Sequence, residues 1–170
     1  HIARIVEGTV ACRDFRGEDG LFVEALVHER PREAPEVPLE FILTIPRGAS
    51  EANPAPVLIF LHGINSSKGQ MRPIADAVAA EGIACIAIDA VEHGSRKTFP
   101  DLMPWMPFLS IGDLARGRDN IRQTQVDLLT LGRAVRLSLE AALGEAVLDT
   151  DALLFAGYSL GGIVGTPYVA

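Results

Sequence analysis

The stretch GYSLG at residues 157–161 decides the fold, because it follows the apolar run ALLFA at residues 152–156 and precedes small and apolar residues that can start a helix. An apolar strand that turns through G-x-S-x-G into a helix is typical of a nucleophile elbow, which holds a serine hydroxyl out at the tip of a sheet. Gly157 and Gly161 fit this turn, since the strand and helix backbones approach too closely there for a Cβ. We therefore expect Ser159 to be a catalytic nucleophile.

Two further apolar runs precede this motif, VLIFL at residues 57–61 and IACIAI at residues 83–88. Continuous apolar runs of this length are typical of parallel strands that are covered on both faces. A helix is predicted between them over residues 67–82, and a long helix over residues 118–143 precedes the last strand. Strands that alternate with helices predict an α/β fold with a doubly wound, mostly parallel sheet.

Both predicted helices begin with residues that can cap them. Ser67 and Gln70 have the S-x-x-Q spacing of a capping box, in which each side chain accepts from a free backbone N–H of the first turn. Asp119 or Asn120 is the expected N-cap of the long helix.

Residues 1–50 show a different pattern. Apolar and polar residues alternate there over three short stretches, residues 4–10, 21–27 and 39–45. This alternation predicts antiparallel strands at the edge of the sheet, with one face toward solvent. Residues 55–170 then form the α/β core as far as the elbow, so we expect residues 1–170 to be a single, incomplete domain.

A serine can attack a carbonyl only if hydrogen-bond donors stabilise the oxyanion that forms. The turn supplies one donor, the backbone N–H of Leu160. In this architecture the second donor lies in the loop after an earlier strand, and the backbone N–H of Ile64 fits that position. Gly63 lets the backbone approach closely, and His62 is expected to shape the loop rather than to act as a base.

Three stretches together resemble the α/β-hydrolase superfamily: residues 58–68, residues 86–89 leading to 92–96, and residues 157–162. A further stretch, residues 118–124 with 127–129, is similar to bacterial lipases and esterases catalogued with virulence-associated lipases. The resemblance implies a carboxylic ester hydrolase that works through an acyl-enzyme and needs no cofactor. It also implies that Ser159 is the nucleophile and that Ile64 and Leu160 form the oxyanion hole.

The catalytic acid and histidine follow the serine in this superfamily, so we expect them beyond Ala170. The sequence holds four histidines, all before the serine: His1, His28, His62 and His93. His93 is a weak candidate for the base, and a structural role in its loop is the simpler interpretation. The 170 residues alone are therefore expected to be nearly inactive. We expect the domain to be completed by further residues or by a partner segment that pairs with an apolar edge strand.

Composition excludes several other classes of protein. The chain has 15 Lys and Arg against 22 Asp and Glu, a net charge of −7, which argues against a nucleic-acid surface. No stretch approaches the roughly 20 apolar residues that span a bilayer. The sequence shows no metal-ligand spacing, and two cysteines are too few for a disulfide framework.

Two alternatives to the ester hydrolase stay open, a serine peptidase of the same superfamily and a non-catalytic fragment that binds a partner. The apolar cluster at residues 102–109 is either a lid or acyl-binding insertion, or a loop packed over the sheet. The expected ligand is a small ester or a lipid. The resemblance favours a secreted or periplasmic protein, while the small number of cysteines is also compatible with the cytoplasm.

Overall fold

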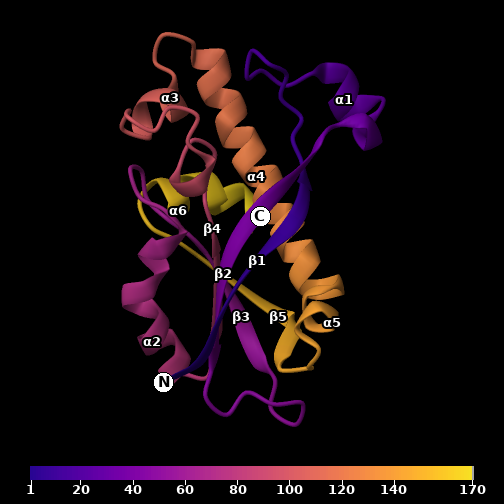
Figure 1. Cartoon of the computed structure of the whole chain (residues 1–170), viewed down its shortest axis with the longest axis vertical. Helices are drawn as coiled ribbons and strands as arrows, with labels where there is room; N and C mark the ends of the chain where they lie inside the picture. The colour runs from indigo at the N-terminus through magenta and orange to yellow at the C-terminus, as the bar shows by residue number, and fades with distance from the viewer. Residues whose placement is uncertain (170) are drawn as a thin grey trace.

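The computed structural model describes residues 1–169, which form a five-stranded mixed sheet with helices on both faces (Figure 1). The strands are β1 (Ile2–Arg13), β2 (Glu36–Pro46), β3 (Ala55–Leu61), β4 (Ala84–Ile88) and β5 (Leu148–Gly157). Their order across the sheet is β1-β2-β4-β3-β5. β1, β2 and β4 pair antiparallel, whereas β3 pairs parallel with both β4 and β5. The predicted α/β fold class, with antiparallel N-terminal strands, is confirmed.

Two sets of helices cover the sheet. The helices are α1 (Glu24–His28), α2 (Arg72–Ala80), α3 (Trp105–Leu109), α4 (Leu114–Leu137), α5 (Leu139–Leu143) and α6 (Leu160–Gly165). Short 3-10 turns occupy Pro31–Glu33, Lys68–Met71, Gly94–Arg96 and Thr166–Tyr168. Helix α2 packs on one face, while α4 and α6 pack on the other (Figure 1). None of the helices within residues 1–169 is long and apolar enough to cross a bilayer.

The two faces of the sheet bury separate apolar cores because side chains alternate along each strand. On β3, Val57, Ile59 and Leu61 enter the larger core on the side of α4. Phe60, with the half-buried Leu58, enters the smaller core, which includes residues of α2. This double burial explains why β3 and β4 are apolar throughout their length, as the sequence predicted.

The expectation of a strand over residues 21–27 is wrong, since α1 and an irregular segment occupy that region. The segment is anchored to α4 rather than to the sheet. The backbone N–H of Phe22 donates to Oδ2 of Asp119 at 2.9 Å, and the guanidinium of Arg122 lies 4.4 Å from the centre of the Phe22 ring. Those contacts join residues about a hundred positions apart, so an alternating local pattern could not reveal them.

The long helix also begins earlier than expected, and a different residue caps it. Helix α4 starts at Leu114, where the side chain of Asp113 accepts from the backbone N–H of Arg116 at 3.2 Å. Asp119 and Asn120 lie inside the helix and are fully buried, so neither is the N-cap. Helix α5 continues the course of the predicted helix to Leu143 after a break at Ser138.

Candidate active site

The turn between β5 and α6 holds Ser159 in a conformation that is strained for a residue with a side chain. Its backbone has φ 52° and ψ −113°, and the residue is exposed. A non-glycine residue at such a positive φ costs about 1–3 kcal/mol and is concentrated at functional sites. A Cβ on Gly157 would overlap the backbone of Gly161 and Gly162, and one on Gly161 would overlap the carbonyl of Leu61. The glycines therefore allow the tight turn.

The loop after β3 lies directly beside this turn. A Cβ built on Gly63 would lie 2.9 Å from Cδ1 of Tyr158 and 3.5 Å from Cβ of Ser159. The backbone N–H of Tyr158 also donates to the carbonyl of Leu61 at 3.0 Å. The structure thus brings together the two segments in which the sequence placed the candidate nucleophile and the candidate oxyanion donors.

The backbone N–H groups of Ile64 and Leu160 make no hydrogen bond to protein atoms within residues 1–169. The N–H of Gly63, between His62 and Ile64, instead donates to Oε1 of Gln70 at 2.8 Å. Hence Gly63 does not compete as an oxyanion donor. Two main-chain donors near an exposed serine are the arrangement that acyl transfer requires.

The sequence pattern does not predict this role of Gln70. The expected capping box is not formed, because no side chain caps the 3-10 turn that starts at Lys68. The S-x-x-Q spacing was a real signal, but the glutamine side chain reaches the loop after β3 instead of the start of its own helix.

His62 is held by both ring nitrogens. Its Nε2 accepts from the backbone N–H of Ala90 at 3.0 Å, and its Nδ1 donates to the carbonyl of Gly63 at 2.8 Å. Burial lowers the pKa of His62, which favours the neutral ring. These contacts tie the loop after β3 to the loop after β4, and they leave the imidazole no free nitrogen with which to accept a proton.

His93 is buried behind the same loops. Its Nδ1 lies 2.8 Å from the carbonyl of Val91, and its ring packs against those of His62 and Phe108 at centroid distances of 5.0 and 5.1 Å. Burial lowers the pKa of His93 as well. Its Nε2 has no hydrogen-bond partner in the described part of the chain. The ring is fully buried, which supports a structural role rather than proton transfer at the exposed serine.

The other two histidines are exposed at other places. His28 lies on α1 and pairs with Glu24 of the same helix at 3.2 Å. The amino group of His1 pairs with Asp76 on α2.

An ion pair between the buried Asp89 and the half-buried Lys68 fixes the loop after β4. Asp89 accepts from the backbone N–H and from Nζ of Lys68 at 2.6 and 2.7 Å, and from the backbone N–H of Ser95 at 3.0 Å. Burial by itself would raise the pKa of Asp89, but these hydrogen bonds and the Lys68 charge lower it overall. Gly94 packs so closely on this carboxylate that a Cβ there would overlap it. The pair positions these loops, and within residues 1–169 it makes no hydrogen bond to Ser159.

Metal ligation has no support in the described residues. Within residues 1–169, no group of three or more His, Cys, Asp or Glu side chains is placed to hold a metal ion. Cys12 and Cys85 are both buried and free.

No family model and no curated protein matches the sequence, whereas solved structures match its fold. A provisionally named dienelactone hydrolase from Klebsiella pneumoniae has a TM-score of 0.56 at 18% identity, over 97% of this chain and 54% of its own. A provisionally named acetyl xylan esterase from Bacteroides fragilis has a TM-score of 0.61 at 13% identity, over 94% of this chain and 43% of its own. An α/β-hydrolase enzyme from the metagenome of Lake Arreo has a TM-score of 0.55 at 18% identity, over 96% of this chain and 37% of its own.

These comparisons show that the chain has the α/β-hydrolase fold. The chain spans between 37% and 54% of the length of those three structures.

Proposed function

We propose that Ser159 is the nucleophile of a carboxylic ester hydrolase. One observation carries the proposal: an exposed serine with positive φ lies in a turn that packs against the loop after β3, and the backbone N–H groups of Ile64 in that loop and of Leu160 in the turn donate to no other described atom. Among the structures of similar fold, one carries the name of an acetyl xylan esterase. The closer resemblance of the sequence to virulence-associated lipases stays a prediction.

The reaction follows from this geometry. The Oγ of Ser159 loses its proton to a base and attacks the ester carbonyl carbon, which forms a tetrahedral intermediate. The carbonyl oxygen, now negatively charged, accepts from the N–H groups of Ile64 and Leu160. Collapse of the intermediate breaks the ester C–O bond, and the alcohol leaves with the proton from the base. Water then hydrolyses the acyl-enzyme by the same steps and frees the carboxylic acid.

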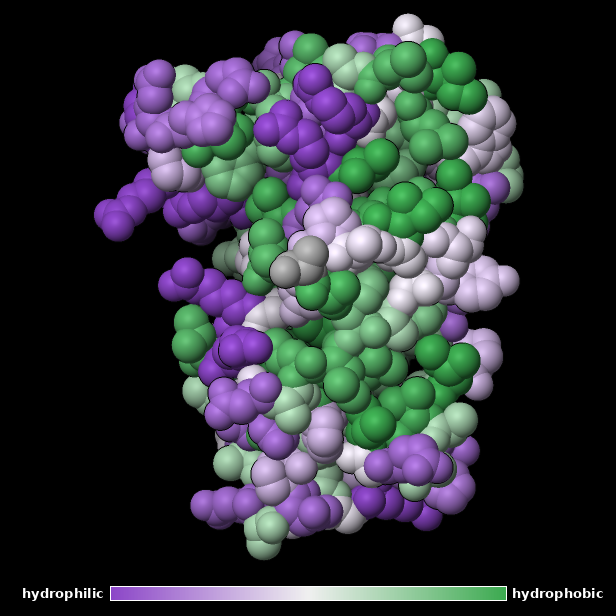
Figure 2. All heavy atoms as spheres, turned by 180° about the vertical axis from the view of Figure 1, so that it is seen from behind, coloured by the Kyte–Doolittle hydropathy of each residue, from purple (hydrophilic) through white to green (hydrophobic). Residues whose placement is uncertain are grey.

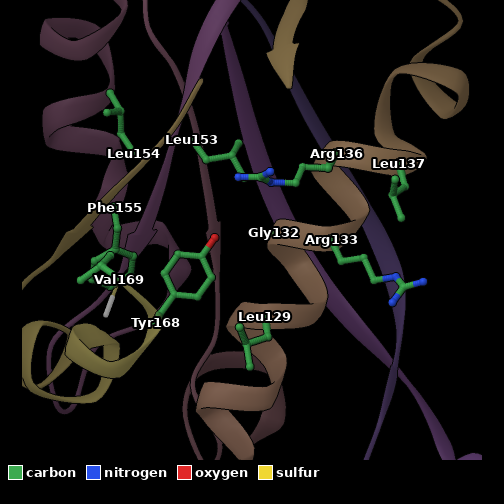
Figure 3. Close-up of a pocket in the computed structure, with 10 residues that line it drawn as sticks. All are labelled: Leu129, Gly132, Arg133, Arg136, Leu137, Leu153, Leu154, Phe155, Tyr168 and Val169. Atoms are coloured by element: carbon green, nitrogen blue, oxygen red, sulfur yellow. The ribbon is translucent and has the colours of Figure 1, made fainter. Parts of the chain in front are cut away.

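Residues 1–169 offer no histidine that is placed to act as the base, so we propose that the base and its acid come from a segment outside these residues. A groove of about 570 Å³ lies between β5 and α4 (Figure 3). It is lined by Leu129, Gly132, Arg133, Arg136, Leu137, Leu153, Leu154, Phe155, Tyr168 and Val169. Among the described strands, β5 pairs only with β3.

The outer edge of β5 therefore offers backbone groups to one more strand, and the groove offers apolar surface to the side chains that accompany it. We propose that the segment carrying the base is a further part of the same protein that adds to this edge. The alternative is that a partner chain binds at this edge. The edge of β5 that no described strand pairs with is the observation that supports a non-catalytic protein that binds a partner.

A fluorophosphonate probe tests the nucleophile directly. In the longest natural form of the protein, we expect the probe to label Ser159, and Ser159→Ala to abolish both labelling and ester hydrolysis. Ser50→Ala is the matched control, because Ser50 is also exposed but lies in the loop between β2 and β3, at the opposite ends of the parallel strands. Absence of labelling at Ser159 in that protein would refute the hydrolase. Faster cleavage of peptide amides than of matched esters would favour the peptidase.

A further inference from the structure

An apolar segment lies next to the candidate active site and is only partly used by the core. It connects β4 to α4, contains α3, and lies on the side of the sheet where the parallel strands end (Figure 1). Seen from behind, hydrophobic residues gather in the upper right of the molecule, over α3 (Figure 2). A pocket of about 380 Å³ opens in this segment, within the range of roughly 300–1,000 Å³ that is common for small-ligand sites.

The inner side of the segment is firmly held. Phe108 is fully buried against the ring of His93, and the side-chain amide of Asn120 donates to the carbonyls of Pro107 and Phe108 at 3.1 and 3.0 Å. A Cβ on Gly117 would overlap the carbonyl of Leu109. These contacts agree with a loop packed over the sheet at residues 102–109, but only for the inner face of α3.

The outer side is different. Met106 is 43% exposed and Ile111 65% exposed, and both line the pocket with Phe99, Leu102 and Trp105. Clustered apolar side chains that the core does not bury mark a site for an apolar ligand. The charged residue in the lining is Arg116, whose guanidinium lies 3.8 Å from the carboxylate of Glu92. The pocket wall thus carries no acidic side chain that would repel a carboxylic acid product.

A direct hydrogen bond joins this segment to the loop of the proposed oxyanion hole. The side-chain oxygen of Asn65 accepts from the backbone N–H of Trp105, the first residue of α3, at 3.0 Å. Asn65 follows Ile64 immediately and has φ 62°, a left-handed conformation that asparagine tolerates better than most residues. Trp105, in the pocket wall, is therefore hydrogen-bonded to the residue that directly follows Ile64, the proposed oxyanion donor.

From this arrangement we propose that the pocket binds the acyl chain of the ester substrate, so that the enzyme prefers esters of medium-length, apolar acids. This inference rests on the proposed function. Because Asn65 joins the pocket wall to the loop that carries Ile64, an ester bound with its carbonyl oxygen at Ile64 and Leu160 would extend one of its two arms toward the pocket, and the apolar lining suits an acyl chain. Burial of each methylene in an apolar wall is worth about a fourfold gain in affinity, so preference rises with chain length until the pocket is filled.

The test compares acetyl and octanoyl esters of 4-nitrophenol, with the longest natural form of the protein. We expect Met106→Ser combined with Ile111→Ser to lower the ratio of kcat/KM for octanoyl over acetyl ester at least tenfold. Ile5→Ser is the matched control, because Ile5 is 55% exposed on β1 and lies outside the pocket. An unchanged ratio in the double variant would overturn the inference.

Binding gives a second readout that does not need turnover. In the Ser159→Ala background, we expect octanoate to bind in calorimetry, and the double variant to weaken this binding at least tenfold. If the parent enzyme hydrolyses acetyl ester but octanoate binding is the same in both proteins, the inference fails and the proposed function stands.

If Ser159 is not labelled and no ester is hydrolysed, the proposed function fails and the acyl role fails with it. If the double variant loses activity only on esters presented in phosphatidylcholine vesicles, the segment contacts a lipid surface, and the acyl pocket is refuted.

Discussion

The side-chain oxygen of Gln70 accepts a hydrogen bond from the backbone N–H of Gly63 at 2.8 Å. This bond fixes the peptide between His62 and Gly63, one residue before Ile64, whose own N–H donates to no atom within residues 1–169. Gln70 is a positioning residue in the proposed reaction, since it acts through the loop and not on the substrate.

Replacement of Gln70 by leucine is expected to lower kcat by roughly 10–100-fold with little change in KM, because a small displacement of an oxyanion donor weakens transition-state binding. Gln70→Glu retains an acceptor oxygen at the same distance along the side chain and should restore most of the activity. The measurement is steady-state kinetics on a short acyl ester in the longest natural form of the protein. Equal kcat for the leucine and glutamate variants would contradict this role.

Gly161→Ala should destabilise the fold by about 3 kcal/mol, because the new methyl group would overlap the carbonyl of Leu61 and force the elbow away from β3. Gly112→Ala is the matched control, since a Cβ there has no neighbour within 4 Å and its φ is not positive. Urea unfolding of both variants measures the difference. Comparable free energies of unfolding would show that the turn is looser than the structure indicates.

The ion pair between Lys68 and Asp89 should contribute its full stability only between an acidic and an alkaline pH limit. The lowered pKa of Asp89 means that its contribution is complete above its unfolded pKa of about 3.9 and is lost as pH falls through the lower, folded value. Burial alone would lower the pKa of Lys68, but its carboxylate partners raise it. Its contribution is therefore complete below about pH 10.4 and is lost at higher pH. Thermal melts from pH 2 to pH 12 should show both losses.

Lys68→Met leaves the Asp89 carboxylate buried without its cation, so we expect a loss of about 3 kcal/mol at pH 7. Arg72→Met is the control, because the side chain of Arg72 is 66% exposed and its nearest carboxylate, on Glu7, is 3.8 Å away. The stability difference between the Lys68→Met protein and wild type should shrink as pH falls, since a proton taken up by Asp89 removes the buried charge that lacks its cation. A difference that stays constant as pH falls would argue against the pair as its cause.

Removal of the cap of α4 should have a smaller effect. Asp113→Ala deletes the acceptor for the N–H of Arg116 and is expected to cost about 1 kcal/mol. Asp101→Ala removes an exposed carboxylate outside any helix or strand and should change stability by less than about 0.5 kcal/mol. Chemical denaturation of the two variants separates these outcomes, and a larger loss for Asp101→Ala would be incompatible with the observed cap.

The sequence by itself determined the parallel strands and the turn that follows the last of them. Apolar runs at β3 and β4 are long enough to require burial on both faces, and Gly157 is explained by crowding against the nearby backbone of Gly161 and Gly162. Such features depend on neighbours in the chain, so they can be read without knowing the tertiary contacts.

Only the tertiary structure decided where the polar side chains go. Gln70 reaches Gly63 instead of capping its own helix, and Asp119 binds Phe22 instead of starting α4. The same local pattern fits either partner, and the difference arises because a buried polar group must find a hydrogen bond wherever the packed chain brings one within reach. For Asp119 and Phe22 that requirement couples segments about a hundred residues apart, and in both cases the partner is decided by packing rather than by sequence spacing.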